Sequence, residues 1–156
     1  MIERTCCFTG HRKLSAKKIE PIIYNLNREV ERLIQTGVTT FLSGGALGFD
    51  QIAAFLIISK KEMGYNIRLN MALPCKGQED LWTSKEKQLY QQLLDVADSI
   101  EYVSENYDKD CMEKRNKYMV DKSEYCICAL LREKSGTGQT VRFAKEKNRQ
   151  IVNVAK

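Results

Sequence analysis

Apolar residues in this chain follow two alternating spacings. Short, nearly continuous apolar runs that end in a polar or glycine-containing segment indicate buried strands. Between these runs, apolar residues recur every three or four positions, which is typical of a helix that buries one side. The longest such stripe runs from Ile19 to Ile34, with Gly37 as its predicted stop, while Pro21 leaves its first residue open.

These spacings predict strands and helices in alternation. The predicted strands are 5–9, 39–43, 67–73, 99–103, 125–130 and 150–154, and after the first helix the others are 49–63, 84–97, 111–120 and 140–147. Alternation of this kind favours parallel pairing with right-handed crossovers. We therefore expect an α/β fold: a single doubly wound, Rossmann-like domain over residues 1–156, with a mainly parallel central sheet and helices on both faces. In such sheets, ligands bind beyond the carboxyl ends of the strands.

The composition agrees with one domain of ordinary size. The chain has 156 residues, of which 43% are hydrophobic and 29% charged, enough to bury a core. No apolar stretch approaches the roughly 20 residues that span a bilayer, and the first residues show no signal-peptide pattern, so we expect a cytoplasmic protein without a membrane partner. The net charge of +5 suits an anionic partner. Basic and acidic residues are interleaved, however, which makes nucleic acid a lesser expectation than a small anionic ligand.

Six cysteines and one histidine raise the question of a metal site. Cys6 and Cys7 are adjacent in a predicted strand, so their side chains should lie on opposite faces of the sheet. Cys126 and Cys128 alternate within another apolar run, and there is no C-x-x-C pair. Buried thiols explain this spacing better than metal ligation does, and we predict neither a metal nor a bound cofactor.

Three predicted strand-to-helix segments are rich in glycine and small polar residues. They are Thr9-Gly10-His11-Arg12, the run from Ser43 to Asp50, and Ser135-Gly136-Thr137-Gly138-Gln139-Thr140. Glycine lets the backbone approach a ligand closely, and amides at a helix N-terminus bind phosphate oxygens. Each segment alone is equally well explained by a tight turn. Together they predict a binding site at one edge of the sheet.

Charged residues near these segments have two interpretations. Arg12 can pair with phosphate, and His11 can bind a ligand or hold the loop. Asp50 either caps the helix that begins beside it or accepts a hydrogen bond from a sugar hydroxyl. Arg115 and Asn116, on a predicted helix, form either a solvated face or part of the site. The candidate ligand-binding residues are therefore Gly10, His11, Arg12, Ser43, Gly44, Gly45, Gly48, Asp50, Arg115, Asn116, Gly136, Thr137 and Gly138.

Four blocks of the sequence together resemble the YpsA-like family. They are Cys7-Phe8-Thr9-Gly10-His11-Arg12, Gly44-Gly45-Ala46-Leu47-Gly48-Phe49-Asp50, Arg115-Asn116-x-x-Met119-Val120-Asp121 and Gly136-Thr137, with Pro74, Gln78, Trp82 and Tyr90 matching the family's middle segment. This family belongs to the SLOG superfamily of Rossmann-like domains, which is related to the LOG phosphoribohydrolases and to the DprA/Smf DNA-processing proteins. The resemblance implies a nucleotide-like ligand with a phosphate, bound by the candidate residues named above.

One departure from the LOG enzymes bears on activity. Those enzymes carry a Pro-Gly-Gly-x-Gly-Thr-x-x-Glu block with a catalytic glutamate, whereas the comparable run here is Lys134-Ser135-Gly136-Thr137-Gly138-Gln139-Thr140, without that glutamate. The leading hypothesis is therefore a protein that binds or senses a nucleotide or nucleotide-derived ligand and has no hydrolase activity. The alternatives are a nucleoside-phosphate N-glycosidase or phosphoribohydrolase-like enzyme, with Asp50 or Glu133 as its acid-base group, and a single-stranded nucleic-acid-binding protein. A homodimer is expected only by analogy with other proteins of this fold.

Overall fold

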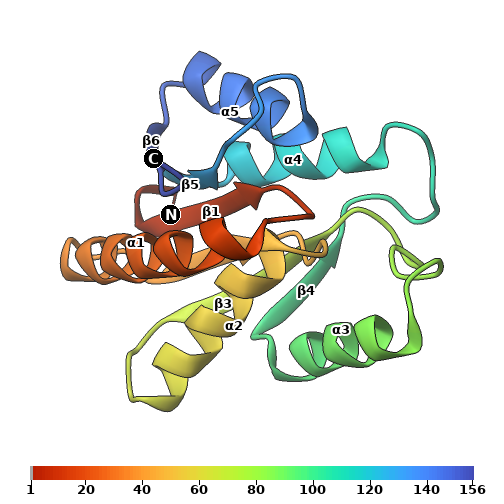
Figure 1. The fold of residues 1–156 in the computed structure, drawn as a ribbon, viewed down its shortest axis with the longest axis horizontal. Helices are drawn as coiled ribbons and strands as arrows, with labels where there is room; N and C mark the ends of the chain where they lie inside the picture. Colours follow the sequence, from red (N-terminus) through yellow and green to blue (C-terminus); the bar gives the residue numbers. More distant parts are fainter. Residues whose placement is uncertain (1) are drawn as a thin grey trace.

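Strands and helices alternate along residues 2–156, the part of the chain that the computed structural model describes (Figure 1). After a short 3₁₀ helix at Ile2–Arg4, the strands are β1 (Thr5–Gly10), β2 (Thr40–Ser43), β3 (Arg68–Leu73), β4 (Ser99–Tyr102), β5 (Tyr125–Ala129) and β6 (Gln150–Asn153). The α-helices are α1 (Ala16–Gln35), α2 (Phe49–Glu62), α3 (Ser84–Val96), α4 (Cys111–Asp121) and α5 (Gly136–Glu146). The order and type of the predicted elements are confirmed.

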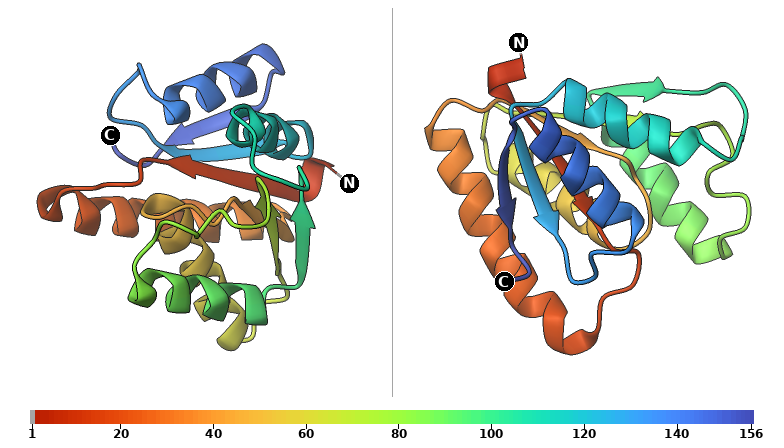
Figure 2. Two further views of the ribbon diagram at one scale, coloured as in Figure 1. Left: turned by 90° about the vertical axis from the view of Figure 1, so that its right-hand side faces the viewer. Right: turned by 90° about the horizontal axis from the view of Figure 1, so that it is seen from above.

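The strands form one parallel sheet in the order β4-β3-β2-β1-β5-β6. From β1 the chain moves outward to β4 on one side; α4 then crosses back, and β5 pairs with the other side of β1. Right-handed crossovers place helices of the two directions on opposite faces. Accordingly α1, α2 and α3 cover one face, and α4 and α5 the other (Figure 1 and Figure 2). This is the predicted doubly wound, Rossmann-like fold.

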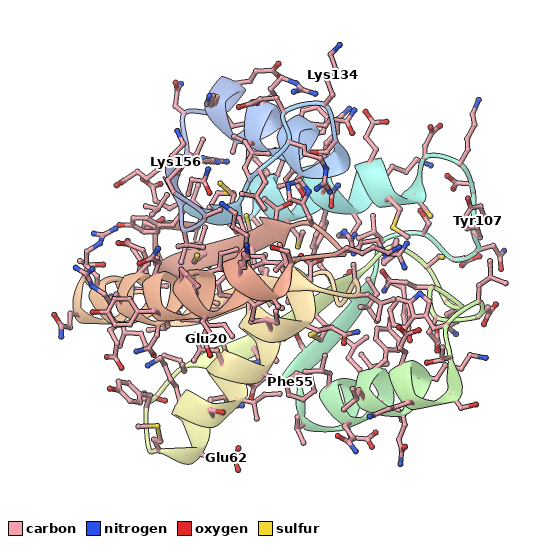
Figure 3. All side chains as sticks on the ribbon, in the orientation of Figure 1. Glu20, Phe55, Glu62, Tyr107, Lys134 and Lys156 are labelled. Carbon is pink, nitrogen blue, oxygen red and sulfur yellow. The ribbon has the colours of Figure 1, made fainter. Side chains whose placement is uncertain are left out.

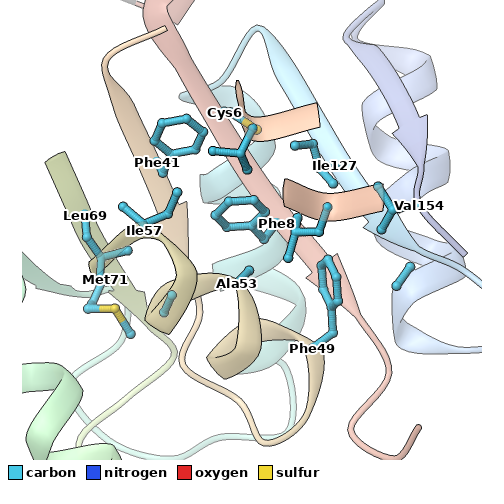
Figure 4. Packing of buried hydrophobic residues seen from close by; sticks show 14 of the residues in the cluster. Cys6, Phe8, Phe41, Phe49, Ala53, Ile57, Leu69, Met71, Ile127 and Val154 are labelled. Carbon is cyan, nitrogen blue, oxygen red and sulfur yellow. The ribbon is translucent and has the colours of Figure 1, made fainter. Parts of the chain in front are cut away.

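The two faces of the sheet bury two apolar clusters. On the face covered by α1, α2 and α3, the Phe8 ring lies between Phe41 and Phe49, with ring centroids 5.8 and 6.3 Å away, as the close view of this cluster shows (Figure 4). Cys6 belongs to this cluster, whereas Cys7 belongs to the smaller cluster under α4 and α5. Adjacent residues of a strand point to opposite faces, and the predicted placement of these two thiols is confirmed.

The start of α5 was predicted wrongly. The helix begins at Gly136, four residues before the predicted start at 140. The Ser135 hydroxyl caps the helix by accepting a hydrogen bond from the Gly138 amide (3.0 Å). Thr137 and Thr140 are buried, so packing stabilises a first turn whose glycines disfavour a helix on propensity alone. Part of the predicted glycine-rich loop is therefore helix.

The start of α1, which the sequence left open, is at Ala16, and the helix continues through Pro21. Proline in a second turn removes one backbone hydrogen bond. The loss is tolerated because one side of the helix is anchored in the core, through Ile22, Leu26, Val30 and Leu33. None of the helices within residues 2–156 is long and apolar enough to cross a membrane.

We expect Phe8→Ala to lower the free energy of unfolding by about 3–5 kcal/mol, because it empties the space between β2 and α2. Chemical denaturation followed by circular dichroism measures this change. Leu81→Ala is the control, since Leu81 is 99% exposed and its truncation should change stability by less than about 0.5 kcal/mol. Comparable losses in both variants would contradict a central role for Phe8 in the core.

Candidate functional site

The segments that follow the strands meet at one edge of the sheet. Because all strands are parallel, segments 11–15, 44–48 and 130–135 leave the sheet at its carboxyl edge, with 74–83 and 103–110 beside them. The direction of winding reverses between β1 and β5, so the segments after these two strands diverge to opposite faces. Open α/β sheets bind ligands at such a point. The three glycine-rich segments thus share one edge, as predicted.

The turn after β2 is fixed by bonds within itself. Ser43 Oγ donates a hydrogen bond to the Asp50 carbonyl (2.8 Å) and accepts one from the Gly45 amide (3.2 Å). Gln51 Nε2 donates to the Gly45 carbonyl (3.1 Å). The two ends of the turn are therefore tied to each other by side chains that are themselves buried.

The same turn packs directly on the segment after β1. Gly48 has a φ of 85°, and a Cβ at this position would collide with the backbone carbonyls of His11 and Arg12. The Phe49 amide donates to the His11 carbonyl (3.1 Å). A Cβ on Gly10 would likewise collide with the Phe49 ring. These glycines bring the segments after β1 and β2 into contact.

Arg115 lies over the turn from α4. Its side chain is buried, and it donates from Nη1 to the Gly44 carbonyl (2.7 Å), from Nε to Asn116 Oδ1 (2.9 Å) and from Nη2 to Met112 Sδ (3.6 Å). A Cβ on Gly44 would collide with the guanidinium, so this approach requires glycine. A guanidinium has five N–H groups. Within residues 2–156, two of them have no acceptor, and no carboxylate lies within 4.0 Å.

Asp50 lies buried in the first turn of α2. Burial raises the pKa of its carboxyl to about 6, against the opposing effects of the Arg115 charge and of a hydrogen bond from the Ala46 amide. Burial lowers the pKa of Arg115, although a guanidinium stays charged in proteins. A carboxyl that titrates near neutral pH close to a buried cation is a common feature of functional sites.

His11 joins the two halves of the sheet. Its Nε2 accepts hydrogen bonds from the amides of Leu131 (2.9 Å) and Arg132 (3.3 Å), and the side chain is buried. Burial, assisted by the Arg132 charge, lowers the pKa of the imidazole, so the ring is neutral at pH 7 and can accept both bonds. Of the two interpretations of His11, this geometry matches the one that holds the loop. Arg12, beside it, is exposed.

The N-terminus of α5 presents unpaired amides at this edge. Gly136 is exposed, and within residues 2–156 the amides of Gly136 and Thr137 have no hydrogen-bond acceptor. Two exposed cations, Arg132 and Lys134, precede the helix, and Lys134 extends outward from the molecule (Figure 3). Free amide donors, the helix dipole and positive charge therefore coincide here.

Gln78 belongs to the site but was absent from the predicted residues. Its Nε2 donates to the Gly44 carbonyl (3.3 Å) and to the Tyr90 hydroxyl (3.0 Å). Tyr90 in turn contacts the Trp82 indole edge to face, with 5.0 Å between ring centroids. Segment 74–83 thus rests on the same turn as Arg115. The similarity of these residues to the middle segment of the YpsA-like family was the sequence signal that pointed to them.

Two hollows in the surface of residues 2–156 lie elsewhere. One, of about 180 Å³, is lined by residues of α1 and of the C-terminal segment, including Asn25 and Lys156. The other, of about 300 Å³, lies between α4 and α5, beside Lys117 and Phe143. Neither includes a predicted site residue.

Comparison of the sequence with models of known protein families identifies the family of this chain. Residues 6–154 match the model of the YpsA family (YspA SLOG family). The chain is a YpsA-family SLOG protein. The resemblance that four sequence blocks indicated is therefore confirmed.

Relatives of this YpsA-family protein include two bacterial sequences without a described activity. The chain is 34% identical over 118 residues to the uncharacterized SPbeta prophage-derived protein YoqJ of Bacillus subtilis, covering 68% of this chain and 69% of YoqJ. It is 27% identical over 126 residues to the UPF0398 protein BH1768 of Halalkalibacterium halodurans, covering 79% of this chain and 67% of that protein.

Two solved structures have a similar fold. DNA processing protein A (DprA) of Streptococcus pneumoniae aligns with a TM-score of 0.64 and 18% identity, over 96% of this chain and 49% of DprA. DprA of Helicobacter pylori, whose structure is described in terms of its single-stranded DNA binding mode, aligns with a TM-score of 0.64 and 21% identity, over 94% of this chain and 63% of that protein. The YpsA-family chain thus spans about half to two thirds of the length of these DprA proteins. At these identities the similarity establishes the fold.

The pH dependence of Asp50→Asn tests the buried carboxyl. Its pKa in the folded chain is about 6, whereas an unfolded aspartate has a pKa of about 3.9. The folded state binds more protons between these values, so the contribution of Asp50 to stability is present below about pH 4 and is lost as the pH rises through 6. Relative to the unaltered chain, we expect the unfolding free energy of Asp50→Asn to rise by up to about 3 kcal/mol between pH 4 and pH 8.

Denaturant unfolding in a series of buffers measures this difference. Asp95→Asn, which removes an exposed carboxylate from α3, is the control, and it should show no comparable trend. A pH-independent difference for Asp50→Asn would contradict the raised pKa.

Proposed function

We propose that this protein binds a nucleotide or nucleotide-derived compound and holds a phosphate of that ligand at the carboxyl edge of β1, β2 and β5. The observation that carries the proposal is Arg115, a buried cation that keeps two N–H groups free and has no carboxylate within 4.0 Å among residues 2–156. A buried charge without a counter-charge costs free energy. A phosphate offsets this cost through charge-assisted hydrogen bonds.

The other predicted ligand residues support the proposal in two ways. Direct donors to phosphate come from Arg115, from exposed Arg12 and from the unpaired amides of Gly136 and Thr137. The remaining residues position these donors by close packing or by hydrogen bonds, and they are Gly10, His11, Ser43, Gly44, Gly45, Gly48, Asp50, Asn116 and Gly138. The ligand-binding surface is thus proposed to have few contact residues and many supporting ones.

A second candidate function is cleavage of the N-glycosidic bond of a nucleoside phosphate. Asp50 favours it, because a carboxyl with a pKa of about 6 suits proton transfer near neutral pH. Glu133 fits this role less well, since its side chain is exposed and its backbone carbonyl packs against Gly138. Release of free base or ribose phosphate from nucleoside monophosphates, measured by chromatography and lost in Asp50→Asn, would establish the enzyme. No release would leave binding as the function.

Single-stranded nucleic acid is a third candidate, and the similarity to DprA gives it more weight than the charge pattern did. Tyr102 and Tyr107 are 40% and 73% exposed, and Tyr107 lies on the outer loop between β4 and α4 (Figure 3). Lys76 Nζ lies 5.7 Å from the centre of the Tyr102 ring. Exposed aromatic rings beside cations are used to stack the bases of single strands. Salt-dependent binding of a labelled oligonucleotide would support this candidate.

We expect Arg115→Met to weaken nucleotide binding by about 10- to 100-fold, because it removes charge-assisted hydrogen bonds. A thermal-shift panel of mononucleotides, dinucleotides, ADP-ribose and cyclic nucleotides first identifies the compound that stabilises the unaltered chain. Isothermal titration calorimetry then measures the Kd. Lys122→Met is the matched control, since Lys122 is an exposed cation that follows the far end of the same helix, and the Kd should stay unchanged.

Circular dichroism and denaturant unfolding of both variants separate a lost contact from a lost fold. Arg115→Lys, which keeps the charge but not the fork of donors, should fall between the unaltered chain and Arg115→Met. If no compound of the panel stabilises the unaltered chain or gives heat on mixing, the proposed function is wrong. Equal weakening by Lys122→Met would indicate a general charge effect in place of a specific site.

A further inference from the structure

Gln78 is held with its carbonyl oxygen unused. Both N–H groups of its side-chain amide are engaged, since Nε2 donates to the Gly44 carbonyl (3.3 Å) and to the Tyr90 hydroxyl (3.0 Å). Within residues 2–156, Oε1 is buried and has no hydrogen-bond donor. Buried polar atoms without a partner are uncommon in native proteins. This oxygen is therefore an acceptor that residues 2–156 leave unsatisfied.

The orientation of the Gln78 amide follows from its surroundings. Turning the amide over would place Oε1 against the Gly44 carbonyl oxygen, and two acceptors repel each other. The Gly44 carbonyl is itself fixed, because Arg115 Nη1 also donates to it (2.7 Å). Oε1 is thus the free atom, and it can only accept.

An aromatic surface adjoins the tethered amide. Tyr90 is buried, and its hydroxyl oxygen accepts the Gln78 hydrogen bond. Burial raises the pKa of this hydroxyl, so the phenol stays neutral. Trp82 contacts this ring edge to face at an interplanar angle of 77°. The indole is only half-buried. Tyr90 therefore holds Trp82 in one orientation while part of the indole stays accessible.

The Gly44 carbonyl connects this aromatic pair to the proposed phosphate site. This oxygen accepts hydrogen bonds from Gln78 Nε2 and from Arg115 Nη1. These two nitrogen atoms are therefore no farther apart than the combined length of the two hydrogen bonds. In a mononucleotide, one ribose separates the base from the phosphate, and that spacing is comparable. A single nucleotide can therefore reach both groups.

We propose that Gln78 and Trp82 form a nucleobase subsite. Gln78 Oε1 accepts a hydrogen bond from an N–H group on the edge of the base, and the ring of the base stacks on the Trp82 indole. This inference rests on the proposed function and narrows its ligand to nucleoside phosphates, as opposed to sugar phosphates that lack a base. Because its N–H groups are already engaged, Gln78 recognises donors and rejects a base edge that presents only acceptors at this point.

Trp82 supplies its own assay, because it is the only tryptophan of the chain. We expect AMP, GMP, CMP or UMP to quench its fluorescence on binding, since stacking brings the base against the indole. Ribose 5-phosphate should bind more weakly, as measured by calorimetry, and leave the emission unchanged. Gln78→Met should raise the Kd of the quenching nucleotide by about tenfold and leave the Kd of ribose 5-phosphate as it was.

Trp82→Leu provides a second variant that does not alter the bonds of Gln78. It should weaken the nucleotide by about tenfold or more, again without effect on ribose 5-phosphate. Equal binding of nucleotide and ribose 5-phosphate, or equal loss of both in Gln78→Met, would overturn the subsite; Gln78 would then only support the turn. The proposed function would survive that result if Arg115→Met still weakened binding as expected. Absence of binding by every nucleotide and by ribose 5-phosphate would overturn both.

Discussion

The hydrogen bond from Arg115 to the Gly44 carbonyl joins residues 71 positions apart, and the arrangement of the carboxyl edge depends on it. The bond fixes α4, which crosses back over the sheet, to the turn that begins α2. It also orients the carbonyl on which Gln78 rests, so segment 74–83 takes its position from the same atom. Glycine at position 44 is what admits the guanidinium to the turn. One backbone oxygen thus organises three segments of the site.

The charges at this edge are arranged at some cost to stability. Asp50 and Arg115 are both buried and influence each other's titration, yet they lie too far apart to form an ion pair. A fold selected for stability alone replaces such groups with apolar side chains or brings them into contact. Positions where local rules are broken without a compensating contact are often functional. The two charges are consistent with a site that is completed by a ligand.

The fold and the edge of the site could be predicted, because both follow from local spacing. Residues such as Ile22, Leu26 and Val30 repeat at a helical period, and glycine marks the turns. The role of His11 could not be predicted, since its partner Leu131 lies 120 positions away. Gln78 was left out of the predicted ligand-binding residues, because only its match to the family's middle segment pointed to it and its bonds to Gly44 and Tyr90 form only in the fold.

The surroundings of each glycine indicate whether a tight turn or a binding site explains it. At Gly44 and Gly48, close packing within the protein is a sufficient explanation, because a Cβ would collide with Arg115 or with the segment after β1. At Gly136 a Cβ would meet no atom within 4 Å, so packing does not account for the residue. Sequence alone treats these glycines alike, and only their surroundings distinguish them.

The place of β1 in the sheet has a consequence for the growing chain. Cys7 on β1 lies opposite Leu42 of β2 on one side and opposite Cys126 of β5 on the other. During synthesis the first partner emerges early, whereas the second emerges only after most of the chain. Until β5 has emerged, β1 therefore has one edge without a paired strand, and another strand can pair with that edge instead. Because His11 also waits for Leu131 and Arg132, the proposed ligand site can form only after these residues have emerged.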